Sequence, residues 1–207
     1  MKINWRGYEF KWIQGGLGVL TEDIAGHVHS KNSYEIHYIV GGKGELLTAE
    51  KSYNLREGMF FITGPNVYHE QKTHKEDPLT EVHCYLQCSG KKTNDILGNI
   101  FFEHRFYIGQ QKKFKRYFLN IAKELEQKNI GYESMVECNL QYILTEYTRG
   151  CIKEYKLPKK EDMADLNDAR FLRIEVELMT KGDDVTLSLL AEKIGVCERQ
   201  VQRLLEK

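Results

Sequence analysis

This chain of 207 residues lacks any long apolar run, any closely paired cysteines and any net charge. No window approaches the roughly 18 to 20 apolar residues that a membrane-spanning helix needs. The N-terminal stretch MKINWRGYEFKW also lacks the apolar core of a secretory signal peptide. We therefore expect a cytoplasmic protein that does not enter a membrane.

The cysteines and the charge balance exclude further classes of protein. The five cysteines, Cys84, Cys88, Cys138, Cys151 and Cys197, are scattered and nowhere form a CxxC pair. This spacing argues against a disulfide framework or a zinc ribbon, so we expect reduced thiols. The 30 Lys and Arg residues balance 30 Asp and Glu residues. Because the net charge is zero, any contact with nucleic acid must be local or depend on a dimer.

The first half of the chain has the pattern of a β domain. Residues 5 to about 90 contain short β-branched and aromatic runs, separated by turn signals such as Gly15-Gly16 and Gly64-Pro65-Asn66. Regular short strands of this kind are typical of a sandwich or a barrel. The expected strands are YEFKWI, SYEIHYIV, GELLTAE, SYNL, MFFIT and LTEVHCYLQC.

From Gln110 the apolar period changes to that of a helix. The pattern predicts two amphipathic helices with Gly131 between them. A second face of the later helix, with Tyr142, Glu146 and Arg149, is open either to solvent or to a partner chain. The two apolar stripes consist of Phe114, Phe118, Ile121 and Leu125, and of Val136, Leu140, Ile143 and Tyr147.

These patterns divide the chain into four segments and place it in the α+β class. Residues 1–109 are expected to form a β-barrel, 110–156 a helical segment, 157–166 a linker and 167–207 a small all-α domain. The linker falls in the charged sequence EYKLPKKEDMADLN, which has little apolar periodicity.

The last 22 residues, TLSLLAEKIGVCERQVQRLLEK, predict two short helices joined by a tight turn. Apolar residues recur at helical spacing on both sides of Gly195, which tolerates positive φ. Cys197 and Gln200 stand where a capping box is expected, although cysteine is a weak cap. The alternative to a helix-turn-helix is an ordinary helical hairpin. In a helix-turn-helix the second helix enters the major groove. Its outward, DNA-binding positions are Arg199, Gln202 and Arg203.

Four potential metal ligands occur in the β half: His27, His29, Glu35 and His69. Residues two apart on a strand share a face, so His27 and His29 can converge, as can Glu35 and His37. Imidazoles with one carboxylate suit zinc, iron, nickel or manganese. The same groups can instead line a polar pocket or hydrogen-bond one another. We expect a ligand pocket of His27, His29, Glu35, His37 and His69 without a cofactor, and the alternative is a divalent metal on His27, His29, Glu35 and His69.

Other polar side chains of the β half divide by context. His83, Tyr53 and Tyr85 can add to the pocket if their strands face inward. His74 and His104 lie in polar or irregular segments and are expected at the surface.

Together the two patterns resemble the AraC family of bacterial transcription regulators, which join a cupin-type effector barrel and paired helices to two helix-turn-helix units. The resemblance rests on the HxH of His27 and His29, on YEIHYIVGGKGEL, on the Gly58-to-His69 segment and on LSLLAEKIGVCERQVQRL. It implies a double-stranded β-helix (cupin or jelly-roll) barrel, a two-helix dimerisation segment and a partial helix-turn-helix domain. The resemblance implies that Arg199, Gln202 and Arg203 contact DNA. It also implies an effector pocket of His27, His29, Glu35 and His69.

Three departures from the family pattern affect the expected function. Five residues separate His29 from Glu35, more than in metal-bearing cupin enzymes, which disfavours a preformed metal site. Glu198 stabilises the start of the second helix but repels DNA. The second helix-turn-helix of the family is absent, so two half-sites would need a dimer.

The resulting hypothesis is a non-enzymatic, effector-responsive transcription regulator. It would bind a small molecule, such as a sugar, in the barrel and would bind DNA through the helix-turn-helix. It would form a homodimer through residues 110–156. One alternative is a metal-dependent cupin enzyme, such as a dioxygenase or isomerase. The other is a truncated regulator that binds ligand and dimerises without binding operator.

Overall fold

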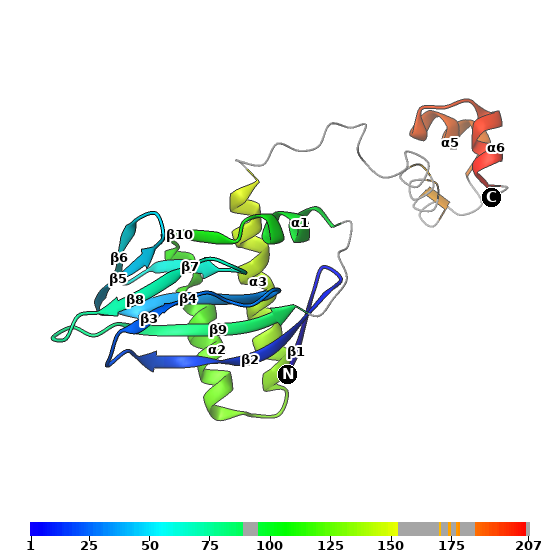
Figure 1. The fold of residues 1–207 in the computed structure, drawn as a ribbon. Helices are drawn as coiled ribbons and strands as arrows, with labels where there is room; N and C mark the ends of the chain where they lie inside the picture. Colours follow the sequence, from blue (N-terminus) through cyan, green and yellow to red (C-terminus); the bar gives the residue numbers. More distant parts are fainter. Residues whose placement is uncertain (89–94, 153–169, 171–173, 175–176, 179–184, 206–207) are drawn as a thin grey trace. The chain divides into compact units, whose positions relative to one another are not determined.

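The computed structural model describes residues 1–88, 95–152, 170, 174, 177–178 and 185–205 (Figure 1). The chain divides into two compact units, Met1–Tyr155 and Lys156–Lys207. The predicted linker at 157–166 lies outside the described residues. The boundaries proposed from the sequence within each unit therefore stay predictions, and each unit is described by itself.

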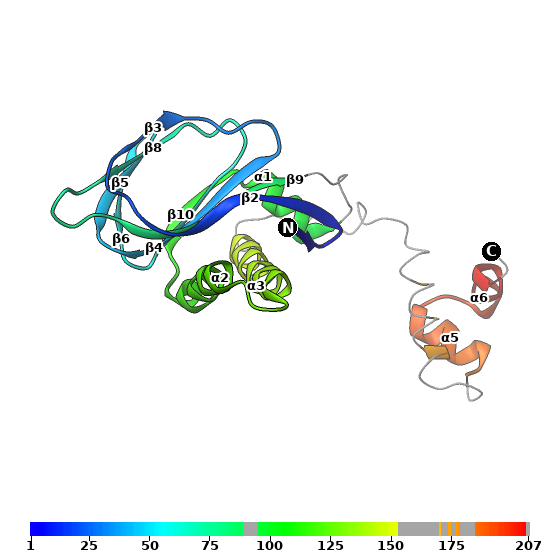
Figure 2. The same ribbon diagram turned by 90° about the horizontal axis from the view of Figure 1, so that it is seen from below.

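The first unit contains two antiparallel sheets. The larger has the strand order β1-β2-β9-β4-β7-β10 and the smaller the order β3-β8-β5-β6. Figure 2 shows the two sheets curving around each other as a roll, with helices on the outer side of the larger sheet. The strands are β1 (Lys2–Trp5), β2 (Tyr8–Val19), β3 (Ile24–His27), β4 (Ser33–Gly41), β5 (Lys43–Thr48), β6 (Ser52–Arg56), β7 (Met59–Thr63), β8 (His69–Thr73), β9 (Thr80–Cys88) and β10 (Phe106–Gln110).

The central strand β4 separates an apolar face from a polar one. Ile36 and Tyr38 are fully buried in the cluster that the larger sheet forms with the helices. Ile39 instead packs in a second cluster with residues of β5 and β6 from the opposite sheet. Because side chains alternate along a strand, Glu35 and His37 share the face of Ile39. The fold therefore directs these two polar residues between the sheets.

Helices cover the other face of the larger sheet (Figure 2). They are α1 (Ile96–Glu103), the short η1 (Lys112–Phe114), α2 (Lys115–Gln127) and α3 (Tyr132–Cys151). The predicted apolar stripes are confirmed: all of their residues are buried except Leu125, which is partly buried. In the described part of the chain, no helix has the length and apolar character needed to cross a membrane.

The strands expected from the sequence are present, but four others were missed. β1, β3, β8 and β10 were not anticipated. The sequence of β8, HEQKT, has no apolar alternation, because its two buried side chains are His69 and Gln71. A strand with a polar interior face does not produce the pattern by which strands are recognised.

The second unit contains α5 (Leu187–Ile194) and α6 (Glu198–Leu205), joined by a short turn. Gly195 has φ +66°, as the expected tight turn requires. Leu190, Ala191 and Ile194 form a small core with Val201. The side chain of Gln200 accepts a hydrogen bond from the Cys197 amide at 3.2 Å, which is one half of a capping box.

Candidate functional site

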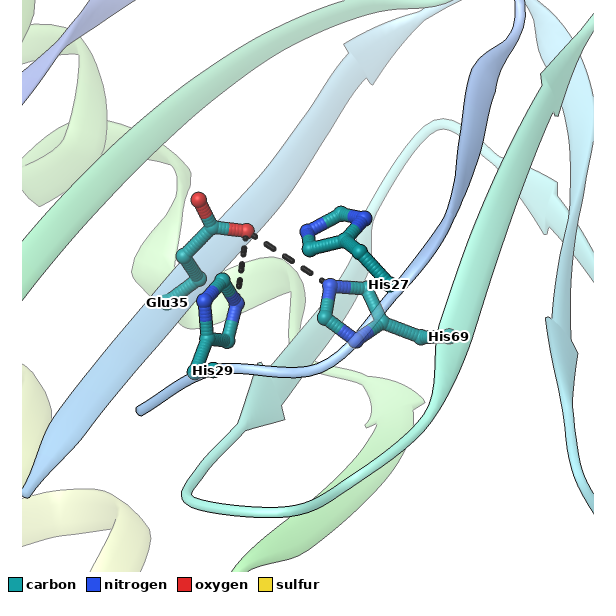
Figure 3. A group of neighbouring side chains, drawn as sticks. All are labelled: His27, His29, Glu35 and His69. Carbon is teal, nitrogen blue, oxygen red and sulfur yellow. Dashed lines mark ion pairs between the residues drawn. The ribbon is translucent and has the colours of Figure 1, made fainter. Parts of the chain in front are cut away.

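Four side chains from β3, the segment after it, β4 and β8 meet between the sheets of the first unit (Figure 3). His27 ends β3, His29 follows it, Glu35 lies on β4 and His69 begins β8. One nitrogen or oxygen atom of each residue can be chosen so that all four atoms lie within 4.8 Å of one another. The structure thus brings together all four potential metal ligands expected from the sequence.

Strand pairing accounts for this convergence. His27 is the ladder partner of His69, and their ring centroids are 4.3 Å apart. His29 reaches the same place through a single bridge to Pro65. Glu35 Oε2 lies 3.2 Å from Nε2 of His29 and 3.7 Å from Nε2 of His69 (Figure 3). The loop of five residues between His29 and Glu35 does not prevent the approach.

The backbone determines which nitrogen of two imidazoles faces the carboxylate. Nδ1 of His27 lies 2.9 Å from the carbonyl oxygen of Ala25, and Nδ1 of His69 lies 3.0 Å from that of Val67. A carbonyl oxygen only accepts, so each Nδ1 must donate. In the neutral imidazole, Nε2 then presents a lone pair, which is the arrangement typical of metal-ligating histidines.

Two buried imidazole nitrogens of the cluster have no hydrogen-bond partner among the described residues. Nε2 of His29 and Nε2 of His69 are buried and make no hydrogen bond of acceptable geometry among them. Both face Glu35 Oε2, which only accepts when ionised. Either a proton on an imidazole nitrogen or a cation must therefore lie between these atoms. Three imidazoles and one carboxylate are a donor set suited to zinc, iron, nickel or manganese.

His37 lies directly behind this cluster. Its Nε2 is 3.1 Å from Glu35 Oε2, and its Nδ1 is 3.2 Å from Oε1 of the buried Glu81. The carboxamide of Gln71 donates to the other oxygen of Glu81 at 2.7 Å. The imidazole stacks on Phe61, with ring centroids 4.3 Å apart. His37 therefore contacts Glu35 as expected, but as part of a chain of buried polar groups.

The buried groups His37, Glu35 and Glu81 shift one another's pKa values. Burial alone would lower the pKa of His37, but the carboxylates of Glu81 and Glu35 raise it to about 10. Burial would raise the pKa of Glu35, whereas the adjacent imidazoles of His29, His37 and His69 bring it well below the usual range. The pKa of Glu81 is also lowered, against the effect of its burial, chiefly by His37. All three groups are therefore held in their charged forms.

Sequence reasoning missed Glu81 and Gln71. Glu81 stands in the apolar run LTEVHCYLQC, two residues before His83 and on the same face of β9. An acidic residue at an inward position of a buried strand is a signal that could have identified it. Gln71 gave no such signal, because β8 itself was not predicted.

Other predicted residues occupy different positions. His83 and Tyr85 are half-buried on β9, opposite His37 and Glu35 in the ladder, and so belong to the same interior wall. Tyr53 instead packs on Phe106 in the apolar cluster between the sheets. His74 is exposed as expected, and His104 is half-buried.

A separate candidate surface lies on α6. Arg199, Gln202 and Arg203 are exposed, whereas Val201 is fully buried against α5. Their spacing of three and four residues puts them on one side of the helix. The expected DNA-contacting residues thus share a solvent-facing surface of the second unit.

Comparisons with known proteins concern both units. The family described as AraC-like ligand binding domain matches residues 21–144. No curated protein matches this sequence. A cupin protein from Bacteroides fragilis is similar at 18% identity, over 45% of this chain and 75% of that one, with a TM-score of 0.32. An apo variant of ToxT from Vibrio cholerae is similar at 10% identity, over 99% of this chain and 76% of that one, with a TM-score of 0.44.

Proposed function

Because this chain belongs to the family of AraC-like ligand binding domains, we propose that it is an effector-responsive bacterial transcription regulator. In this proposal a small molecule binds between the sheets of the first unit, and α5 with α6 contacts DNA. The observation that carries the proposal is the convergence of His27, His29, Glu35 and His69 within the matched residues 21–144. Buried polar groups of this kind are costly unless they have partners, which a bound ligand supplies.

The effector site would be centred on a divalent cation held by His27, His29, Glu35 and His69. This differs from the metal-free pocket expected from the sequence, and the reason is the orientation of the imidazoles. The buried Nε2 atoms of His29 and His69 face the Glu35 carboxylate, and a cation between them would give all three groups a partner. When bound, such a cation acts as a Lewis acid that holds an oxygen atom of the effector.

Neighbouring side chains favour a polar effector, such as a sugar. Thr63 and Tyr85 are the ladder partners of Glu35 on either side of it, and His83 is the partner of His37. The Thr63 hydroxyl is buried and makes no hydrogen bond to the described residues. Hydroxyl, phenol and imidazole groups on one wall suit a ligand with several hydrogen-bonding groups.

DNA binding would use the exposed side of α6. Arginine and glutamine can bond bidentately to guanine and adenine, so Arg199, Gln202 and Arg203 suit base contacts in the major groove. The effector would act by changing how this surface is presented, which requires a different affinity for two arrangements of the protein.

A homodimer would form through the outer face of α3. Met135, Cys138 and Tyr142 lie at spacings of three and four residues, hence on one side of the helix, and all are exposed. Met135 is 49% exposed and Tyr142 is 38% exposed. A second copy would cover them.

The metal site is tested by the metal content of the full chain purified without chelator. We expect about one equivalent per chain in the wild type, because sites with three imidazoles hold metal firmly. The substitutions Glu35→Gln and His69→Gln should remove it, whereas His74→Gln, which alters an exposed histidine, should not. Less than about a tenth of an equivalent in the wild type would contradict a resident metal.

DNA binding is tested by selection of the full chain on random duplexes, followed by anisotropy measurements at several salt concentrations. We expect a preferred sequence and an affinity that falls with salt. Failure to enrich any sequence, with the metal and the dimer intact, would instead favour a regulator that binds effector and dimerises without binding operator.

The second candidate function is a metal-dependent cupin enzyme. The cluster of four ligand atoms favours it, because three imidazoles and a carboxylate also occur where a metal performs chemistry. Effector screening distinguishes the two functions. A compound that binds the metal-loaded chain and is recovered unchanged supports the regulator, whereas its conversion with turnover supports the enzyme.

A further inference from the structure

We propose that His37, Glu81 and Gln71 are positioning residues that fix the Glu35 carboxylate toward the metal position. The inference rests on the metal site proposed above and adds a role for three side chains that do not themselves reach the metal. It is carried by their contacts: 3.1 Å from His37 to Glu35, 3.2 Å from His37 to Glu81 and 2.7 Å from Gln71 to Glu81.

The geometry at Glu35 assigns one oxygen to this role. His37 Nε2 contacts Oε2 of Glu35, and the same Oε2 faces Nε2 of His29 and of His69. A carboxylate held only by its own torsions can rotate either oxygen toward the histidines. The hydrogen bond from His37 removes that freedom and keeps Oε2 on the side of the three imidazoles.

Both ring nitrogens of His37 must donate for this to work. Each faces a carboxylate oxygen, which only accepts when ionised. Glu81 holds the second nitrogen and so prevents the ring from turning away, while Phe61 lies parallel to the ring at 4.3 Å. Gln71 in turn fixes Glu81, which is 2% exposed.

The chain of contacts joins the two sheets around the site. Glu35 and His37 lie on β4 and Glu81 on β9, in the larger sheet, whereas Gln71 lies on β8 in the smaller one. Gln71 is also two residues after His69, on the same face of the strand. The positions of two metal ligands, Glu35 and His69, are thereby coupled through groups that are not ligands.

Burial of two carboxylates and an imidazolium has a desolvation cost that a purely structural connection does not require. Apolar side chains of similar volume would join the sheets equally well or better. Partners behind metal ligands orient them, and their removal typically lowers metal affinity about 10- to 100-fold. A role in orienting Glu35 therefore explains why these charged groups are buried, whereas holding the sheets together does not.

Two substitutions of one residue separate these roles. In His37→Gln the carboxamide nitrogen takes the place of Nε2 and can still donate to Glu35. In His37→Asn it takes the place of Nδ1 and can donate only to Glu81. The control His74→Gln alters an exposed histidine. Co²⁺ is the probe, because its visible spectrum reports coordination geometry as well as occupancy.

The full chain of each variant is stripped of metal and titrated with Co²⁺, and its apo thermal unfolding is recorded. We expect His37→Asn to weaken Co²⁺ binding about 10- to 100-fold with an altered spectrum. His37→Gln keeps the donor to Glu35 but loses the contact with Glu81, so it should weaken binding less than His37→Asn does, and the control should match the wild type. If His37→Asn does not fold, Glu81→Gln replaces it and should likewise weaken binding and change the spectrum.

The remaining outcomes overturn the inference. Equal Co²⁺ affinity and spectra in His37→Asn and His37→Gln, whatever their unfolding temperatures, would mean that these hydrogen bonds only hold the two sheets together. That result leaves the metal site itself in place. Absence of Co²⁺ binding by the wild-type chain would remove both the metal site and the positioning role, and is recognised by the wild-type titration alone.

Discussion

At the scale of single residues, the central feature is the competition between protons and a cation for the space beside Glu35. The imidazoles of His27 and His69 have their Nδ1 atoms directed to backbone carbonyls, so only Nε2 is available to either. Glu35 remains ionised far into acid, since the neighbouring imidazoles lower its pKa.

We predict that metal affinity falls steeply on acidification from about pH 8 to about pH 5.5, because a ligating imidazole must be neutral. Binding should release protons, which can be measured by titration calorimetry in buffers of different ionisation enthalpy. Glu35→Gln should lower the affinity at both pH values without changing the number of protons released by the imidazoles. A metal affinity independent of pH would contradict this arrangement.

At the scale of elements, Asp95 determines where α1 begins. Its carboxylate accepts a hydrogen bond from the Gly98 amide at 2.9 Å and pairs with the guanidinium of Arg6. Asp95 thus joins the N-terminus of a helix to the turn between β1 and β2. The hydrogen bond from Arg6 is the largest cause of the lowered pKa of Asp95.

We expect Asp95→Ala to destabilise the protein by about 1 kcal/mol, the usual effect of a lost N-cap. Asp95→Asn keeps a capping oxygen and should cost less. Because the pKa of Asp95 is lowered on folding, its contribution is present above about pH 4 and is lost as the pH falls through the lowered value. Urea unfolding near pH 7 and near pH 3 measures both effects, and a difference between wild type and Asp95→Ala that persists at the lower pH would contradict the pairing.

On α6, the acidic Glu198 precedes the three expected DNA contacts. Removing its charge in Glu198→Gln should strengthen DNA binding up to about fivefold, since the repulsion at a solvated surface is worth about 1 kcal/mol or less. Glu192→Gln, on the exposed side of α5, is the matched control. Anisotropy at low salt measures the effect, and weaker binding of Glu198→Gln would indicate that Glu198 itself contacts DNA.

At the scale of the whole molecule, the proposed homodimer would bring together two copies of the exposed surface of α6. We predict a dimer through α3, in which Cys138 lies close to its symmetry mate. In a Cys197→Ser background, mild oxidation should give a disulfide-linked dimer that Cys138→Ser abolishes. Sedimentation of reduced protein checks the dimer independently. A monomer at micromolar concentration would exclude this interface.

Local patterns in the sequence predicted α2, α3, α5, α6 and six of the ten described strands, but not α1. The polar and apolar alternation from Tyr34 to Tyr38 and the helical stripes around Phe118 and Leu140 predict elements directly, because the side chains of one face recur at the period of the element. β8 was not predicted from the sequence because its buried residues are polar. The convergence of His27, His29, Glu35 and His69 was predicted from an HxH on one strand, but His29 lies beyond the end of β3 and reaches the site through its bridge to Pro65.

The sequence by itself determined the two kinds of element, the turn at Gly195 and the histidines that could meet. Only the tertiary structure decided that Glu81 contacts His37 and is itself held by Gln71, and that Nε2 of His29 and of His69 faces Glu35. Periodicity depends on a residue and its near neighbours. Strand order and register depend instead on pairing between segments far apart in the chain, such as β4 with β9 and β5 with β8, and local patterns do not contain that information.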